Sequence, residues 1–458
     1  MTPRHIAVID IGKTNAKLAL VAAADVSEIA VVTLSNTVSE GPPYPHFNVE
    51  GIWTFLLDAL AKFHAHYGID AISITTHGAS GALIAADGSL AAPILDYEHT
   101  GPESLSDEYN ALRPAFEETG SPRLPVGLNF GAQIHWQFSQ DASLRDRTDA
   151  IVTYPQYWGH RLTGVLASDV SSLGCHTDLW NPFRAEFSSL ADRLEITDKM
   201  APVRKSTDVL GPLLPDIAAK TGLAPETPVL CGIHDSNASL LHHVMLRNPP
   251  FSVVSTGTWV IAMTVGGQKT ILDPDRDALV NVNGLGEPVP SARFMGGREY
   301  EIIRAGQSTT CNAAALAAVA RNGPFLMPAV VPESGPFQGH AHHWIGSEPE
   351  QGTPERGAAL SFYLAMMTAE CLSLTRHRGP IVVEGPFATN NGYCEMLSAA
   401  TRCDILISES ATGTSQGAAL LALKSGVLPE ELGPMPFEAT NDPNYRAYAE
   451  NWRMAAAI

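Results

Sequence analysis

The sequence has few cysteines and few basic side chains. Its six cysteines include no C-x-x-C pair, which argues against a zinc site and favours a reducing, cytoplasmic compartment. Lysine and arginine number 29 against 48 aspartates and glutamates, for a formal net charge of −19. This balance argues against nucleic acid or an anionic membrane as a partner, because no basic surface is available to offset phosphate repulsion.

Long apolar runs are missing as well. No uninterrupted stretch reaches the roughly 18 residues needed to cross a bilayer, and a strand-like run begins at Ile6 without a basic and then apolar leader. We therefore expect a soluble cytoplasmic protein. The 458 residues, 45% of them hydrophobic, are enough for two globular domains of about 200–250 residues each.

One pattern occurs twice. Residues 7–20 (AVIDIGKTNAKLAL) and residues 253–265 (VVSTGTWVIAMTV) each read as a strand, a tight turn of small residues and a second strand. The turn tips offer backbone N–H groups and hydroxyls, which suit an anion such as a phosphate. Two such hairpins, one in each half of the chain, indicate a two-lobed phosphotransferase that holds a nucleotide triphosphate in a cleft between its halves.

The order of elements supports two lobes. Three strand-like runs, at 6–10, 17–23 and 28–34, precede an amphipathic helix at about 51–67 and a strand at 71–75. This β-β-β-α-β order differs from that of dinucleotide-binding folds and resembles the duplicated ribonuclease-H-like lobe of the actin/hexokinase superfamily. We predict an α/β fold with two such lobes, residues 1–246 and 247–458, divided near Asn248-Pro249-Pro250.

The rest of the chain reads less clearly. Residues 97–210 have an irregular pattern, and we expect them to cap the substrate pocket. The other predicted elements are a strand at 229–232, helices at 235–243, 357–376, 392–402 and 413–425, strands at 381–384 and 405–408, a long loop at 323–354, and a peripheral tail with a helix over the last 30 or so residues.

The first hairpin carries the first candidate site residues. Asp10 ends a buried strand, where a carboxylate can hold Mg²⁺ beside phosphates. An ordinary hairpin with an Asx turn is the alternative, and the matching second hairpin favours phosphate binding. The candidate phosphate-binding residues of the two turns are Gly12, Lys13, Thr14, Asn15, Lys17, Thr256, Gly257 and Thr258.

Two further segments carry candidate chemistry. Asp235 follows a strand and opens a helix, so it is either a helix cap or the general base that takes the proton of an attacking hydroxyl. His234 beside it can bind a substrate hydroxyl. Residues 381–423 read as strand, glycine turn, helix, strand and helix, a shelf for an adenine ring. There Gly385 permits close approach to the backbone and Asn390 offers its amide.

These blocks together resemble the FGGY carbohydrate kinases. DIGKTNAK (residues 10–17) is similar to the family's first phosphate motif, Asp-x-Gly-Thr/Ser-x-x-x-Arg/Lys, and STGTW (residues 255–259) is close to its second. His234-Asp235 matches the position of the family's catalytic Asp. Residues 154–164 resemble the family's Asp-Tyr-Leu-x-x-x-Leu-Thr-Gly segment. The motifs stand in the family's order from residue 6 to about 424.

The resemblance implies an ATP-dependent kinase that phosphorylates a hydroxyl of a neutral sugar. It assigns Mg²⁺ to Asp10 and Asp235, and sugar contacts in the first lobe to His77, Gly78, Glu98, His234 and Asp235. The His-Asp pair is similar to the deoxyketose kinases, which favours a ketose: a 6-deoxyketohexose such as L-rhamnulose or L-fuculose, or a pentulose. ATP and a small sugar are then the partners, and homodimers are common among members.

Four positions depart from the family's pattern. The adenosine motif, usually Gly-Gly-Gly-x-x-Asn, reads EGPFATN at 384–390. Gln156 replaces the usual Asp of its segment, and residues 98–100 (EHT) stand where many members have Asp-x-Arg, so sugar contacts there differ. Lys13 replaces a small residue or threonine. None of these changes removes the two aspartates or the hairpin tips, and we expect an active enzyme.

Other interpretations stay open at this stage. A polyol or glycerol kinase would share these motifs, and so would an actin-fold ATPase that acts on a protein. A sugar-sensing regulator would need a DNA-binding module, and no basic helix-turn-helix precedes Ile6. The histidines at 340, 342 and 343 favour a solvated loop over a metal site, and His242 and His243 are expected on a helix surface.

Overall fold

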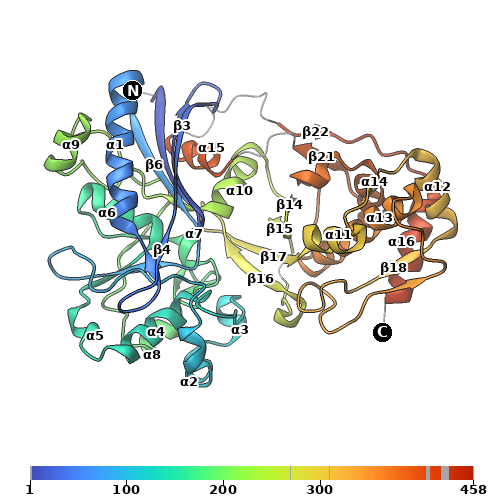
Figure 1. Cartoon of the computed structure of the whole chain (residues 1–458), viewed down its shortest axis with the longest axis horizontal. Helices are drawn as coiled ribbons and strands as arrows, with labels where there is room; N and C mark the ends of the chain where they lie inside the picture. Colours follow the sequence, from blue (N-terminus) through green and yellow to red (C-terminus); the bar gives the residue numbers. More distant parts are fainter. Residues whose placement is uncertain (1–2, 269, 309, 409–412, 424–432, 457–458) are drawn as a thin grey trace. The chain divides into compact units, whose positions relative to one another are not determined.

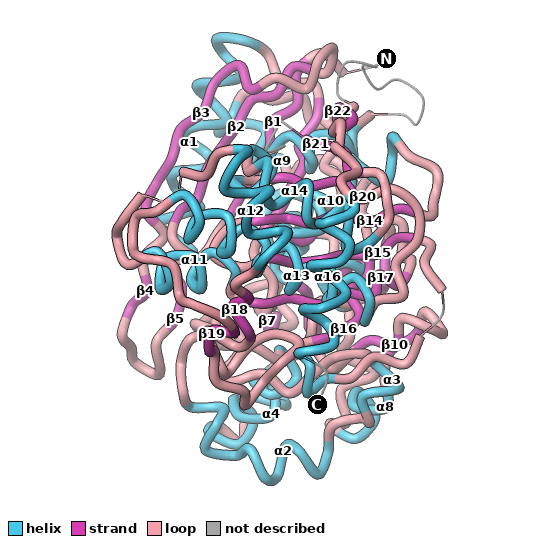
Figure 2. Tube along the Cα trace, turned by 90° about the vertical axis from the view of Figure 1, so that its right-hand side faces the viewer, coloured by secondary structure: helices cyan, strands magenta, loops and turns pink. Residues whose placement is uncertain are grey.

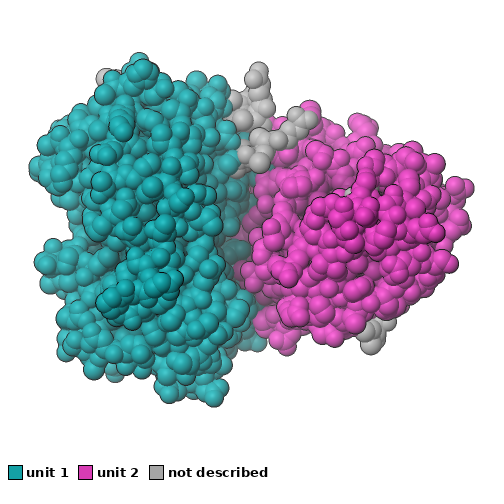
Figure 3. Space-filling view, viewed as in Figure 1, with its two compact units in different colours: residues 1–246, 280–288, 412–430 teal, residues 247–279, 289–411, 431–458 magenta. Residues whose placement is uncertain are grey.

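The computed structural model describes residues 3–268, 270–308, 310–408, 413–423 and 433–456. The chain divides into two compact units (Figure 3). The first unit contains Met1–Leu246, Val280–Pro288 and Thr412–Glu430, and the rest of the chain forms the second. The chain thus first leaves the first unit after Leu246 and later returns to it twice. The sequence analysis had assigned both returning segments to the second lobe.

A five-stranded sheet in the order β13-β6-β1-β2-β3 forms the centre of the first unit. β1 (His5–Ile11) is antiparallel to β2 (Asn15–Ala22), and β2 to β3 (Glu28–Ser35). β6 (Ala71–Thr76) is parallel to both β1 and β13 (Ile233–His234). The carboxyl ends of β1, β6 and β13 therefore meet at one edge of the sheet, which is where open α/β sheets place their binding residues.

Helices cover both faces of this sheet. β1 and β6 are almost wholly buried, as expected for strands with both faces covered. On one side α1 (Val49–Tyr67) packs against β2 and β3, and α6 (Tyr154–Thr163) against β6. On the other side α10 (Asp235–Leu246) and α15 (Thr414–Ala419) contact β6 (Figure 1). The sheet edge that carries the strand ends is thereby held between two layers of helix.

The early elements confirm the predicted order. The first three strands, α1 and β6 lie within two residues of their predicted limits. α1 begins at Val49 because the Asn48 side chain accepts a hydrogen bond from the Gly51 N–H. Its apolar positions recur at helical spacing and face the sheet.

The segment predicted as irregular contains regular helices. α4 (Phe130–Gln140) and α6 were both missed, and β8 (Ala150–Thr153) pairs with β7 (Gly81–Ile84) outside the main sheet. Nearly every residue of α6 is buried. A helix that is buried on all sides shows no alternation between apolar and polar faces, so periodicity cannot reveal it.

The remaining elements among the described residues of the first unit are short. They are β4 (Val38–Ser39), β5 (His46–Phe47), α2 (Ser106–Leu112), α3 (Phe116–Thr119), α5 (Leu144–Arg147), β9 (Ser168–Asp169), α7 (Val170–Leu173), β10 (Trp180–Asn181), β11 (Glu186–Phe187), α8 (Ser189–Arg193), β12 (Val203–Arg204), α9 (Pro215–Thr221) and 3₁₀ turns at Gly101–Leu105 and Leu420–Ala422. The strand predicted at 229–232 lies slightly later, as β13. The helix predicted at 413–425 is α15 with its 3₁₀ turn, and residues 424 and 425 lie outside the described residues.

A seven-stranded sheet in the order β16-β17-β15-β14-β20-β21-β22 forms the centre of the second unit, although the last three residues of β16 and the first residue of β17 belong to the first unit. β14 (Phe251–Thr256) and β15 (Val260–Val265) form the second predicted hairpin, and β20 (Ile381–Glu384) runs parallel to β14. The other strands are β16 (Ala278–Val282), β17 (Pro288–Phe294), β21 (Ile405–Ser408) and β22 (Met435–Pro436). The carboxyl ends of β14 and β20 thus lie side by side, as those of β1 and β6 do in the first unit.

Among the described residues of this unit there are five helices. α12 (Ala313–Asn322), α13 (Pro354–Leu374), α14 (Asn391–Thr401) and α16 (Pro443–Ala456) pack against one another (Figure 2), and α11 (Gly296–Arg304) contacts α13. α11 and α12 were not predicted. The segment predicted as a loop at 323–354 contains the hairpin β18 (Phe325–Met327) and β19 (His343–Ile345), and 3₁₀ turns lie at Pro274–Arg276 and Pro386–Thr389.

The packing corrects two details of the sequence analysis. α16 is not peripheral, because Trp452 is fully buried and donates its indole N–H to Leu326 O at 2.8 Å. His242 and His243 are buried, so their assignment to a helix surface was wrong. Within the described part of the chain, only α13 is long and apolar enough by length and composition to span a bilayer, and 83% of its apolar window is buried. Glu370 interrupts the apolar run of α13, so this helix contains no unbroken apolar stretch of about 18 residues.

Candidate active site

Three strand ends bring most of the first-unit candidates together. Asp10 of β1 lies opposite Thr75 in β6, and His234 of β13 lies opposite Thr76. His77 follows β6 directly, and Asp235 follows β13. Residues more than 200 positions apart thus meet at one edge of the sheet.

Asp10 lies in a ring of polar contacts. Its Oδ2 is 3.2 Å from Lys17 Nζ, and it accepts hydrogen bonds from the Thr414 hydroxyl and from Ser415 Oγ at 3.0 Å. The Lys17 ammonium also lies 3.5 Å from Glu28. Neither Thr414 nor Ser415 was predicted. Their only signal in the sequence is a run of small residues at a helix start.

Asp10 can serve as a magnesium ligand. Mg²⁺ in phosphotransferases is bound through one or two carboxylates together with phosphate oxygens and water. No cluster of three or more His, Cys, Asp or Glu side chains that could hold a metal ion occurs among the described residues. A single carboxylate beside the Gly12–Asn15 turn fits a site in which phosphate oxygens and water supply the other ligands.

The first hairpin tip is shaped as predicted, with one exception. The Gly12 N–H donates to Asn15 O at 2.9 Å, and Thr14 and Asn15 are exposed at the tip. The Lys13 side chain instead turns towards Asp96, with which it forms an ion pair, and towards Glu98 at 3.2 Å.

Hydrogen bonds orient His234 towards Asp235. Asn237 Nδ2 lies 3.2 Å from His234 Nδ1, and because an amide nitrogen can only donate, that ring nitrogen accepts. The ring proton therefore resides on Nε2, which is 3.1 Å from Asp235 Oδ1. A Cβ at Gly78 would lie 2.8 Å from the same Nε2, so this contact requires glycine at position 78.

The pKa values of Asp235 and of the two histidines near it suit a role of Asp235 as a general base. Desolvation raises the pKa of Asp235 to about 6, with His77 opposing and Asp10 adding to the rise. Burial lowers the pKa of His77 and of His234 to about 4, so both rings are neutral at pH 7. The Asp235 carboxylate accepts from the adjacent Ser236 N–H at 2.6 Å. A capping side chain would instead bond the N–H two or three residues further on.

His77 lies in an aromatic cluster beside this base. Its ring packs against Phe47, Tyr97 and Tyr154, with centroid distances of 5.1, 5.2 and 4.9 Å. Nδ1 lies 2.8 Å from Gly78 O, a pure acceptor, so Nδ1 carries the proton. The lone pair of the buried Nε2 has no partner among the described residues.

In the second unit, Thr256 holds the turn after β20. Its hydroxyl donates to Glu384 O at 2.6 Å and accepts from Phe387 N–H at 3.1 Å. Gly385 has φ +83°, and a Cβ there would lie 2.1 Å from Thr256 O, so only glycine fits. Thr258 is exposed at the hairpin tip. Of the two threonines predicted to contact phosphate, Thr258 therefore has the more accessible hydroxyl.

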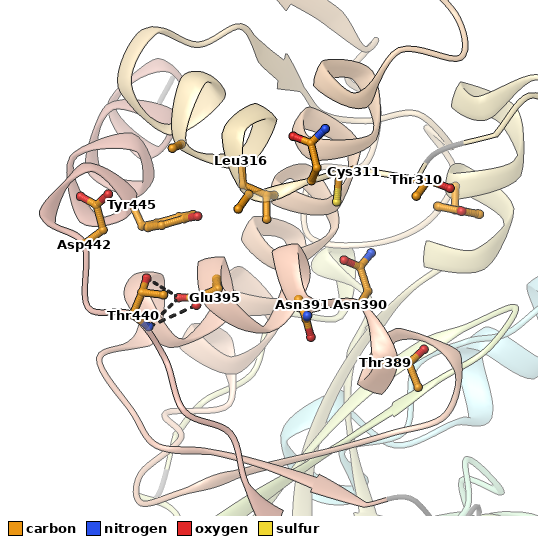
Figure 4. A pocket seen from close by; sticks show the side chains of 14 residues that line it. Thr310, Cys311, Leu316, Thr389, Asn390, Asn391, Glu395, Thr440, Asp442 and Tyr445 are labelled. Carbon is orange, nitrogen blue, oxygen red and sulfur yellow. Dashed lines mark hydrogen bonds between the residues drawn. The ribbon is translucent and has the colours of Figure 1, made fainter.

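A cavity of about 640 Å³ opens beside the altered adenosine motif (Figure 4). Asn390 lines it, and its side chain also caps α14 by accepting from Tyr393 N–H and donates to Ser361 Oγ at 2.9 Å. The opposite wall of the cavity was not predicted from the sequence. The other residues that line the cavity include Tyr300, Thr310, Cys311, Asn312, Ala313, Leu316, Asn391, Glu395, Thr440, Asp442 and Tyr445.

A strand-turn-strand hairpin in each of two α/β units, with an aspartate at the end of a strand, is the two-lobed arrangement of the actin/hexokinase type that the sequence predicted. The model of the FGGY family of carbohydrate kinases, N-terminal domain, matches residues 5–242, and that of the carbohydrate kinase FGGY, C-terminal domain, matches residues 248–430. The chain belongs to the FGGY family of carbohydrate kinases, as the resemblance of its motifs predicted. Members of this family are phosphotransferases with an alcohol group as acceptor.

Individual relatives agree on fold and differ in the sugar named. A solved carbohydrate kinase from Novosphingobium aromaticivorans is 34% identical, with a TM-score of 0.91 over 98% of this chain and all of that one. A ligand-bound xylulose kinase from Lactobacillus acidophilus, 15% identical, has a TM-score of 0.78 over 99% of this chain and 96% of that one. An L-fuculokinase from Salmonella typhi is 24% identical over 277 residues. That match spans 57% of this chain and 57% of the relative's length.

Proposed function

We propose that this protein transfers the γ-phosphate of ATP to a hydroxyl of a neutral sugar, and that Asp235 is the general base. The observation that supports this most directly is the position of Asp235. It stands at the strand edge that also carries Asp10, with a pKa raised towards neutrality. A base of this kind is ionised at pH 7 and still able to accept a proton as the hydroxyl attacks.

The residues of the first unit have separate roles in this proposal. The Asp235 carboxylate orients the attacking hydroxyl and takes its proton. The His234 Nε2–H fixes that carboxylate, and the His77 Nε2 lone pair accepts from a second sugar hydroxyl. Asp10 holds Mg²⁺, which when bound offsets charge on the transferred phosphoryl group. Thr414, Ser415 and Lys17 hold the Asp10 carboxylate in place.

The second unit is proposed to hold the nucleoside. The 640 Å³ cavity is of the size that small-molecule sites occupy, and it adjoins the Gly385 turn and Asn390. Thr258 and the backbone of the Thr256–Thr258 turn are the proposed phosphate contacts of this unit. Tyr300 and Leu316 offer apolar surface for the adenine ring, and Asn390 and Asn312 offer amides.

Among sugars, a ketose is the proposed class. The His234-Asp235 pair resembles that of deoxyketose kinases, and the curated relatives that match are named L-fuculokinase. A 6-deoxyketohexose or a pentulose is therefore the first candidate, and a polyol is the competitor.

The proposed function is tested by ADP release with Mg·ATP against ketoses, aldoses and polyols of three to six carbons, with a sugar-free control. We expect turnover with one or a few ketoses that exceeds the sugar-free rate at least 100-fold. Turnover restricted to glycerol or another polyol would replace the ketose assignment. Equal ADP release with and without every sugar would contradict the kinase proposal and favour an ATPase.

Filling the second-unit cavity is expected to weaken nucleotide binding. Ala313 is exposed in the first turn of α12 and lines the cavity. Ala313→Trp should therefore raise the KM for ATP at least tenfold, because the indole occupies the space proposed for the nucleoside, and leave the KM for the sugar unchanged. Ala314, equally exposed, is not a lining residue, so Ala314→Trp is the matched control. Equal KM values for ATP in both variants would place the nucleoside elsewhere.

A further inference from the structure

Lys13 belongs by sequence to the first phosphate loop, but its side chain leaves that loop. The ammonium lies over the rings of Tyr97 and Phe47, 4.8 and 5.2 Å from their centroids, and forms ion pairs with Asp96 and Glu98. A lysine bound to two carboxylates and two aromatic faces is held in one position, because each contact opposes the rotation that would return it to the loop tip.

Asp96 depends on this contact. Its side chain is only 11% exposed, and its Oδ1 also accepts from Glu98 N–H at 3.2 Å. An ionised carboxylate at such burial needs a paired charge. Glu98, with 63% of its side chain exposed, reaches the same ammonium from the solvent side. Lys13, Asp96 and Glu98 thus form a group of one ammonium and two carboxylates.

This group lies beside the proposed base. Tyr97 packs edge-on against His77. Burial raises the pKa of the Tyr97 phenol most, and the charges of Glu98, Asp235 and Asp96 raise it further. His77 in turn interacts electrostatically with both Lys13 and Asp235. Lys13 and Asp235 therefore both lie near His77, whose buried Nε2 has no hydrogen-bond partner among the residues the structure describes.

From this arrangement we propose that Lys13, Asp96 and Glu98 form a diol-binding group that determines substrate class, and that Lys13 serves the sugar rather than the phosphates. One hydroxyl of a vicinal pair donates to a carboxylate while its neighbour accepts from the ammonium. Lys13 carries one positive charge, and Asp96, Glu98 and Asp235 together carry three negative charges. Because His77 and His234 are neutral, the net charge of these groups is −2. Sugar acids are therefore repelled and neutral sugars accepted. The inference rests on the proposed sugar kinase function.

The test separates sugar binding from ATP binding. The probes are the best neutral substrate of the sugar panel and the aldonic acid of the same chain length, assayed by ADP release. We expect the wild type to prefer the neutral sugar at least 100-fold in kcat/KM. Lys13→Met should raise the KM for the neutral sugar at least tenfold and change the KM for ATP less than twofold. Lys62→Met, at an exposed position of α1, is the matched control.

A second variant tests the charge argument without disturbing the buried carboxylate. Glu98→Gln keeps the shape of an exposed side chain and removes one negative charge, so discrimination against the aldonic acid should fall at least fivefold. Glu108→Gln, also exposed and located on α2, should leave discrimination unchanged. This variant keeps the inference testable even where Lys13→Met folds poorly.

Each contrary result has a distinct meaning. A Lys13→Met variant whose KM rises for ATP and not for the sugar would return Lys13 to the phosphates and overturn the inference alone. The inference would also be overturned if Glu98→Gln left the preference for the neutral sugar over the aldonic acid unchanged, or if the wild type acted equally on both sugars. A wild type that releases no ADP with any sugar would overturn the proposed function together with this inference.

Discussion

Replacement of Asp235 by asparagine is expected to lower kcat for sugar phosphorylation by about 10²–10⁴-fold, the range that a positioned general base contributes. Asparagine keeps the size and hydrogen-bonding shape of the side chain but cannot accept the hydroxyl proton. The KM for ATP should change little, because the proposed nucleoside contacts come from the second unit. Steady-state kinetics with both substrates varied measures the two effects separately.

The pH profile provides an independent readout of the same residue. The base acts when ionised, and its pKa is raised to about 6. The wild-type kcat/KM should therefore fall as the pH is lowered through about 6, and this acid limb should be missing from the residual activity of Asp235→Asn. Asp216→Asn, an exposed carboxylate on α9 in the same unit, is the control and should keep both the rate and the limb. Near-normal turnover in Asp235→Asn would overturn its assignment as the base.

Replacement of Trp452 by alanine is expected to destabilise the second unit by about 3–5 kcal/mol. Trp452 has no exposed surface, packs edge-on against Phe337 and donates its indole N–H to Leu326 O. The substitution leaves a cavity and an unpaired buried carbonyl at once. Calorimetry should show the corresponding melting transition shifted down by roughly 6–20 °C, at 2–4 °C for each kcal/mol.

The control for this prediction lies on the same helix. Met454 is 68% exposed, so Met454→Ala should change stability by less than about 0.5 kcal/mol. A similar shift in both variants would mean that α16 is marginally attached, as the sequence analysis supposed when it assigned the end of the chain to a peripheral tail.

The failure at α16 and the success at the hairpins have one physical origin. The hairpin at Gly12–Asn15 depends on residues within a few positions, and its small, polar turn between apolar strands can be recognised from those residues alone. The burial of Trp452 depends on Leu326 and Phe337, more than 100 positions away. α6 was missed for a related reason, since its neighbours bury it on every side and remove the polar face that marks a helix in sequence.

The candidate site likewise combines features that local sequence predicts with contacts that only the tertiary structure decides. The order of motifs around Asp10, the Thr256–Thr258 turn and Asp235 was sufficient to predict the family, the two-lobed fold and the residues proposed for catalysis, because each motif is a local pattern. Only the tertiary structure paired Asp10 with Thr414 and Ser415, directed Lys13 to Asp96 and Glu98, and gave the cavity beside Asn390 its opposite wall. Those contacts join segments far apart in sequence, and which side chains meet there is decided by strand register and helix packing.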